Sequence, residues 1–125
     1  VNVLTTHSAW LFSSLVSGCN GLLSGSGSVI ADLQARLFEA VRNQDLNAAR
    51  KIYDRIHPTA EVFYANPKVD MHNRMKEALV MLGKLPRAVV RPPLMKLPGT
   101  EIETVKAALI AAGLLAPERG ISLVA

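Results

Sequence analysis

Two short segments with strand character lie near the beginning of the chain, separated by a helical segment. "VNVLTT", residues 1–6, alternates β-branched and polar side chains, and "GLLSG", residues 21–25, is a short apolar run. Between them, Trp10 or Leu11, then Leu15 and Cys19, recur at helical spacing, and Gly18 is a typical helix-ending residue. A strand, a helix and a second strand form a βαβ unit, so we expect the two strands to run parallel.

This unit constrains the fold because the rest of the chain has the pattern of helices rather than further strands. Two parallel strands do not form a stable sheet by themselves, since parallel sheets are normally covered on both faces. The chain also begins with Val1 rather than methionine. We therefore expect this sequence to be a piece of a larger α/β protein.

Four further helices are predicted from apolar residues that recur every three or four positions. The first begins at Ser28. The second follows the "NQD" break and continues past Pro58, and the third begins near Asp70 and ends at Gly83. The residues expected on the buried faces are Val29, Ile30, Leu33, Leu37, Phe38 and Val41; then Leu46, Ala49, Ile52, Tyr53 and Ile56; then Met71, Met75, Ala78, Leu79 and Leu82; and, in the fourth helix, Ile102, Val105, Leu109 and Ala112.

A proline-rich strap separates the third and fourth of these helices. Residues 85–98 contain four prolines, which predict an extended segment rather than a helix. "TEIE" then predicts a capping box, in which Thr100 and Glu103 begin the last helix. We expect that helix to end at Gly113 and the tail after Pro117 to be loose.

Composition and charge exclude several classes of protein. Half of the residues are apolar and 19% are charged, as in a globular protein, and no stretch reaches the about 18 uninterrupted apolar residues of a membrane span. The net charge is +4, but the basic residues are scattered among acids and lack interleaved aromatic residues, so we expect no nucleic-acid partner.

Cys19 is the single cysteine, as in proteins of the reducing cytoplasm, which is the expected location. Trp10, Met71 and Met75 are expected in the core.

The run "NGLLSGSGSVI", residues 20–30, carries the most chemical information. It lacks the third glycine of a G-x-G-x-x-G dinucleotide motif and the Gly-Lys-Ser/Thr of a Walker loop. The start of the following helix could still bind an anion through free backbone N–H groups. His7, His57 and His72 have no spacing that would complete a metal site, so no metal is expected.

The order and spacing of several motifs resemble one known family. "GCNGLLSG", "SVIADLQARLFEAVRNQDLNAARKIYDRI", "KEALVMLG" and "VRPPLMKL" together resemble the C-terminal part of the dihydrodipicolinate synthase and N-acetylneuraminate lyase family, from Val3 to about Leu114. The resemblance implies the last two βα units of a TIM (β/α)8 barrel in residues 1–43. It also implies a three-helix C-terminal extension in residues 44–125, with the strap at 85–98, and hence a mostly helical chain.

The resemblance also implies where a ligand would lie, because substrates of such barrels bind at the C-terminal ends of the strands. Similarity to the sialic acid lyase branch puts Thr6, Ser8 and Ala9 where that branch has a glycine and two acids, and Gly25 where it has a serine. A long polyhydroxy sugar acid is therefore not the expected substrate. Similarity to the synthase branch puts Leu23 at a backbone carbonyl near the reactive lysine. The candidate substrate-binding residues are Thr6, His7, Ser8, Leu23, Ser24, Gly25 and Ser26.

Members of the family form a Schiff base between a 2-oxo acid and a lysine on strand six. That position would precede Val1, and the first lysine of this sequence is Lys51, in the helical region. The resemblance thus implies the C-terminal fragment of a lyase or synthase that acts on pyruvate or another 2-oxo acid by aldol chemistry. We expect the fragment alone to be inactive, and the intact enzyme to be a homo-oligomer without an organic cofactor. The alternatives are a non-enzymatic helical interaction domain and an anion-binding βα module.

Overall fold

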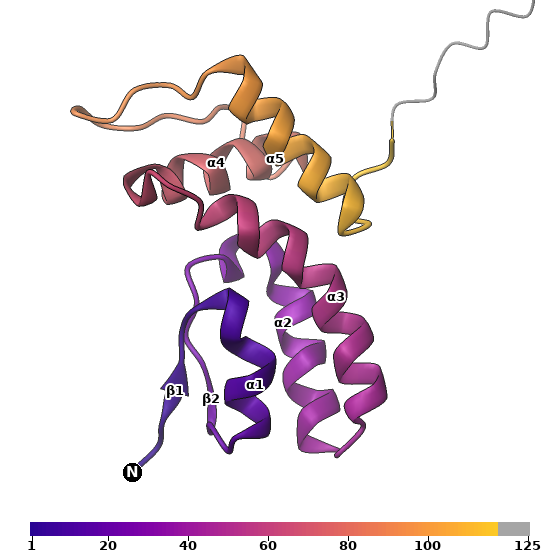
Figure 1. Cartoon of the computed structure of the whole chain (residues 1–125). Coiled ribbons are helices and arrows are strands. Elements are labelled where there is room, and N and C mark those ends of the chain that lie inside the picture. Colours follow the sequence, from indigo (N-terminus) through magenta and orange to yellow (C-terminus); the bar gives the residue numbers. More distant parts are fainter. Residues whose placement is uncertain (118–125) are drawn as a thin grey trace, which may run out of the picture.

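The chain folds into two short strands followed by a series of helices (Figure 1), and the structure, a computed structural model, describes residues 1–117. In chain order the elements are β1 (Leu4–Thr5), the 3-10 helix η1 (Ser8–Trp10), α1 (Leu11–Val16), β2 (Gly21–Leu22), α2 (Gly27–Arg42), α3 (Leu46–Phe63), the 3-10 helix η2 (Lys68–Asp70), α4 (Met71–Met81) and α5 (Gly99–Ala111). Most of the described residues are helical, as the sequence predicts.

The two strands pair in parallel, which confirms the predicted βαβ unit. Leu4 of β1 lies opposite Gly21 of β2. Asn20 extends the pairing by one residue, because its backbone N–H donates to the Val3 carbonyl at 2.8 Å and its side-chain Oδ1 accepts from the Val3 N–H at 2.8 Å. This register brings the C-terminal ends of both strands to the same edge.

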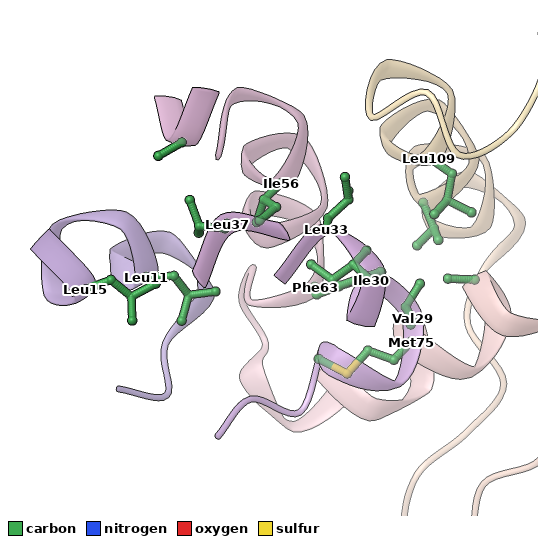
Figure 2. Packing of buried hydrophobic residues seen from close by; sticks show 13 residues of the cluster. Leu11, Leu15, Val29, Ile30, Leu33, Leu37, Ile56, Phe63, Met75 and Leu109 are labelled. Carbon is green, nitrogen blue, oxygen red and sulfur yellow. The ribbon is translucent and has the colours of Figure 1, made fainter. Parts of the chain in front are cut away.

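The core lies between the helices, with α2 packed along α3 and the upper helices α4 and α5 closing over their ends (Figures 1 and 2). Figure 2 shows side chains of α2, α3 and α5 pointing toward one another. Asp45 begins α3 by accepting a hydrogen bond from the Ala48 N–H at 2.9 Å. The buried members of this core are Leu11, Leu15, Val29, Ile30, Leu33, Leu37, Ala49, Ile56, Phe63, Met75, Ala78, Val105 and Leu109.

Arg74 of α4 joins three parts of the helical region. Its side chain is almost fully buried, with Nε 3.0 Å from Glu101 Oε2 of α5. One terminal nitrogen of its guanidinium donates to the Ala65 carbonyl at 2.8 Å and to the Pro67 carbonyl at 3.3 Å. Because these carbonyls lie in the turn between α3 and α4, Arg74 fixes that turn against α5.

The proline-rich strap contains no helix or strand, as predicted. It is tied to α4 by two side chains of that helix. Asn73 Nδ2 donates to the Met95 carbonyl at 2.7 Å, and Lys76 Nζ donates to the Val89 carbonyl. Leu97 is buried at the end of the strap, just before α5.

Helix α5 begins differently from the prediction. It starts at Gly99, directly after Pro98, and no side chain caps it, so the predicted capping box is wrong. Thr100 lies inside the first turn, where its carbonyl accepts a hydrogen bond from the Thr104 hydroxyl at 3.0 Å. A residue with helical neighbours on both sides cannot occupy the cap position, which requires a non-helical backbone.

Two residues expected in the core are exposed. Trp10 is 64% exposed at the end of η1, whereas Leu11 and Leu15, which are four residues apart, share the buried face of α1. Leu46 is 48% exposed because it begins α3 at the tip of the α2–α3 turn.

The division of the chain after residue 43 stays a prediction, and the tail predicted to be loose after Pro117 lies outside the described residues.

Tyr53 connects α3 to the segment that follows β1. Its hydroxyl donates to the Ala9 carbonyl of η1, and its ring stacks on Phe12 of α1 with centroids 5.7 Å apart. Burial raises the pKa of the Tyr53 hydroxyl above its usual value of 10.0, and the nearby Asp54 carboxylate adds to this rise.

We expect Tyr53→Phe to lower the free energy of unfolding by about 1 kcal/mol at neutral pH, because the Ala9 carbonyl loses its donor. The raised pKa means that the wild-type contribution is fully present below pH 10.0 and is lost as the pH rises through the pKa of the folded state. Urea unfolding at neutral and alkaline pH measures both effects. The control is Tyr64→Phe, since the Tyr64 hydroxyl donates to none of the residues that the structure describes. A Tyr53→Phe variant as stable as this control would contradict the prediction.

Candidate functional site

The residues that follow β1 and β2 meet at one edge of the sheet. The Leu23 N–H donates to the Thr5 carbonyl at 2.8 Å, so the parallel pairing continues to the last residue before both loops. The loop after β1 carries residues 6–8, and the loop after β2 carries residues 24–26. The structure therefore brings the two halves of the predicted site together.

Three serines from these two loops form a buried cluster of hydroxyl groups. Ser8 Oγ lies 3.1 Å from Ser24 Oγ and within hydrogen-bond distance of Ser26 Oγ, and Ser24 Oγ lies 2.9 Å from Ser26 Oγ. Gln34 of α2 donates from Nε2 to Ser24 Oγ at 3.1 Å and to Ser26 Oγ at 3.0 Å. Ser8 and Ser26 are fully buried. The cluster thus ties the ends of both strands to α2.

The contacts of this cluster are as many as the protons that its members carry. Three hydroxyl protons and the two protons of the Gln34 amide supply the contacts among the three serines and from Gln34 to Ser24 and Ser26. A ligand could accept a hydrogen bond from Ser8, Ser24 or Ser26 only if one of these contacts broke. In this arrangement the serines hold the strand ends in place.

Gln34 is a member of the site that the sequence analysis missed. It lies within the apolar stripe of α2, between Leu33 and Leu37, and is 3% exposed. A polar residue within an apolar helical face indicates a buried hydrogen-bond partner, and this was the available signal. Gly27 packs close to its amide, since a Cβ at Gly27 would lie 3.1 Å from Gln34 Oε1.

His7 lies at the end of β1 and makes two defined contacts. Its Nδ1 accepts a hydrogen bond from the Ala9 N–H at 3.2 Å, which caps η1. Its ring faces that of Tyr64, with centroids 4.9 Å apart and planes tilted by 31°. Tyr64 follows α3 directly, so the helical extension reaches the predicted site.

The other predicted site residues are more accessible. Thr6 is exposed, and Leu23 is 71% exposed. Gly25 is also exposed, and a Cβ there would contact His72 and Met75 of α4 at ordinary van der Waals distances of 3.8 and 3.9 Å. The site thus has an inner layer of the buried Ser8 and Ser26 with the half-buried Ser24, and an outer layer of the half-buried His7 with the exposed Thr6, Leu23 and Gly25.

The outer surface of the strand pair is apolar and accessible. Leu4 is 53% exposed and Val3 is 57% exposed, and β1 and β2 form a sheet of two strands within the described residues. Each strand therefore has one edge that pairs with no other described strand. A sheet edge of this kind is normally paired or covered in native proteins.

Neither a metal centre nor a membrane span occurs in the part of the chain that the structure describes. No three His, Cys, Asp or Glu side chains in residues 1–117 are grouped as ligands of a metal ion would be. None of the helices in the same residues combines the length and the apolar character needed to cross a bilayer. All six lysines lie on α3, on α4 and beyond, outside the two strands and their loops.

Comparison with known proteins found similarity at the level of structure. No family model and no curated protein matches the chain. A monomeric variant of dihydrodipicolinate synthase superimposes with a TM-score of 0.82 and 20% identity, over 91% of this chain and 37% of that one. The chain has the fold of the C-terminal part of the dihydrodipicolinate synthase family. This result confirms the resemblance and the fold inferred from the sequence.

Two further members of that family show the same correspondence. YagE, a prophage protein of the dihydrodipicolinic acid synthase family from E. coli K12 solved in complex with pyruvate, is 26% identical over 90% of this chain, with a TM-score of 0.79. The family enzyme from Cyanidioschyzon merolae, solved with lysine bound, is 27% identical over 91% of this chain, with a TM-score of 0.77. The chain spans 37% of the length of each.

We expect Ser26→Ala to lower the free energy of unfolding by about 2–3 kcal/mol, because it removes two hydroxyl contacts and leaves a Gln34 N–H without its acceptor. The matched control is Ser28→Ala two residues later, where the exposed hydroxyl donates only to the Gly25 carbonyl at 3.0 Å, and where a change within about 0.5 kcal/mol is expected. Urea unfolding of both variants measures the difference. Equal losses in the two variants would show that the cluster does not stabilise the strand ends.

Proposed function

We propose that this chain is the C-terminal flank of an enzyme that forms a Schiff base with pyruvate or another 2-oxo acid and makes or breaks a carbon–carbon bond by aldol chemistry. The main support is the correspondence of about nine-tenths of this chain to 37% of proteins with that fold. The unpaired edges of the two parallel strands agree with it, because a closed barrel supplies a neighbouring strand on each side.

The reactive amine in this proposal belongs to a lysine on a strand that this chain does not include. A lysine attacks a carbonyl carbon only when its amine is unprotonated, which a dry pocket favours by disfavouring the ammonium ion. Lys51 on α3 and Lys84 after α4 are exposed to solvent, so neither lies in such a pocket. We propose that the 125-residue chain alone forms no imine.

The site divides into two layers with different roles. Thr6, His7, the Leu23 carbonyl and Gly25 are proposed to face the ligand, since these groups are accessible at the ends of the strands. Ser8, Ser24 and Ser26, the other members of the predicted site, are proposed to fix the geometry of those groups from beneath. The contacts among the three serine hydroxyls, which equal their protons in number, support this division.

The proposed partner of the 2-oxo acid is a short aldehyde rather than the polyhydroxy aldehyde from which a sugar acid would form. A long sugar chain needs several side chains that can exchange hydrogen bonds with its hydroxyl groups. Ser8 is fully buried with its proton engaged, and Ala9 has no polar side chain. The site therefore offers few partners to such a chain.

We also propose a cytoplasmic location and a homo-oligomeric enzyme, with no organic cofactor. The location is supported by Cys19, a single thiol that no internal disulfide can engage. The oligomer rests on the resemblance to the family alone. No metal is proposed to take part in the reaction.

Borohydride trapping tests the proposed reaction. The protein translated from the whole open reading frame is incubated with pyruvate and sodium borohydride, and intact-mass spectrometry is expected to detect one reduced pyruvate adduct on a lysine that precedes Val1. The 125-residue chain, treated in parallel, is the control and is expected to stay unmodified. Absence of an adduct on the longer protein would disprove the proposed function, and an adduct on Lys51 or a later lysine would disprove the assignment of the amine.

A further inference from the structure

The contact between His7 and the Ala9 N–H fixes which nitrogen of the imidazole carries a proton. A nitrogen that accepts a hydrogen bond from a backbone N–H has its lone pair directed at that donor and cannot hold a proton. Because Nδ1 is the acceptor, at 3.2 Å, the His7 proton resides on Nε2. Nε2 is therefore the nitrogen of the ring that is left to donate a hydrogen bond in this conformation.

The same contact leaves one side of the ring for a ligand. Nδ1 is occupied by the Ala9 N–H, which caps η1. Nε2 is therefore the ring nitrogen that can meet a ligand in the observed geometry.

Tyr64 restricts the orientation of this donor. The two ring centroids are 4.9 Å apart, so the phenol ring limits rotation of the imidazole about its own side-chain bonds. Tyr64 is itself held at the end of α3, where its N–H donates to the Ala60 carbonyl at 3.2 Å and where the next residue, Ala65, is bound by Arg74 at 2.8 Å. The helical extension thus sets the plane of a ring that belongs to the barrel part of the chain.

We propose that His7 is a specificity-determining hydrogen-bond donor, acting through Nε2–H on an oxygen atom of a short aldehyde substrate, and that Tyr64 is its positioning residue. This proposal rests on the proposed function and adds to it the class of the second substrate and a role for the helical extension. An oxygen acceptor is required, because a fixed N–H donor next to an apolar group would be left without a partner.

The histidine tautomer is measured first, by ¹⁵N NMR of the histidine-labelled chain. The expected His7 spectrum shows one pyridine-like nitrogen and one protonated nitrogen, in the Nε2–H form, whereas His57 and His72, both exposed, serve as internal references. Tyr64→Leu is expected to mix the two tautomers of His7, and Tyr64→Phe, which keeps the ring, is expected to leave the spectrum unchanged. A His7 ring protonated on Nδ1 in the wild type would overturn the proposal.

Kinetics of the longer protein then separate the donor role from a purely structural cap. Asparagine can accept the Ala9 N–H bond as a cap residue, but its shorter amide does not place an N–H where Nε2–H lies. We expect His7→Asn to retain the wild-type unfolding midpoint and to raise the KM for the aldehyde about five- to tenfold, as loss of one neutral hydrogen bond predicts. Tyr64→Leu is expected to raise the same KM, and Tyr64→Phe to leave it unchanged.

The outcomes distinguish this proposal from the proposed function. An unchanged aldehyde KM in His7→Asn, with pyruvate trapping intact, would refute the donor role and leave the Schiff-base reaction standing. A wild-type protein that forms no pyruvate adduct would refute both the reaction and the substrate role of His7. A drop in the unfolding midpoint of His7→Asn together with an unchanged KM would assign His7 to capping alone.

Discussion

The parallel pairing of β1 and β2 is the interaction on which the rest of the structure depends. Because parallel strands end at the same edge, two loops that are far apart in sequence become neighbours, and Ser8 can reach Ser24 and Ser26. Backbone pairing alone would hold two-residue strands weakly. The hydroxyl cluster and Gln34 add side-chain hydrogen bonds at the ends of the strands, where the backbone hydrogen bonds stop. The bonds from Gln34 fix these strand ends to α2. The accessible groups above the cluster are thereby held on a rigid base.

The helical extension does more than cover the core. Tyr53 binds the Ala9 carbonyl, Tyr64 packs on His7, and α4 lies against Gly25, so α3 and α4 contact both loops of the candidate site. Arg74 holds the turn between those two helices against α5. A displacement of α3 or α4 would therefore move side chains at the strand ends. This coupling gives the extension a physical role in shaping the site, which helices serving only as a cover would not have.

The sequence predicted the order of the elements well because that order depends on local signals. Apolar periodicity defined α2 to α5, and Gly18, Gly83 and Gly113 adopt the positive φ angles expected where helices end. The prediction failed for Trp10, which was expected in the core. Trp10 lies in the 3-10 helix before α1 and is exposed. Most of the candidate site was found through resemblance and strand position. Gln34 was overlooked, although its place in the apolar stripe of α2 was a local signal for a buried hydrogen bond. Tyr64 could not be predicted, because it meets His7 across 57 residues of sequence and no local pattern encodes such a contact.

The hydrogen bonds already made by the side chains at the strand ends limit what these side chains can contribute to an active site. Nucleophilic or proton-transferring side chains need a free lone pair or an exchangeable proton directed at the ligand. The three serines have their protons engaged with one another, and the Nδ1 lone pair of His7 is engaged with a backbone N–H. What is left for a ligand is a set of fixed groups that can orient it. Such groups favour positioning over proton transfer, so the reactive amine of the proposed reaction belongs on another strand of the barrel, which is where the resemblance to the family puts its lysine.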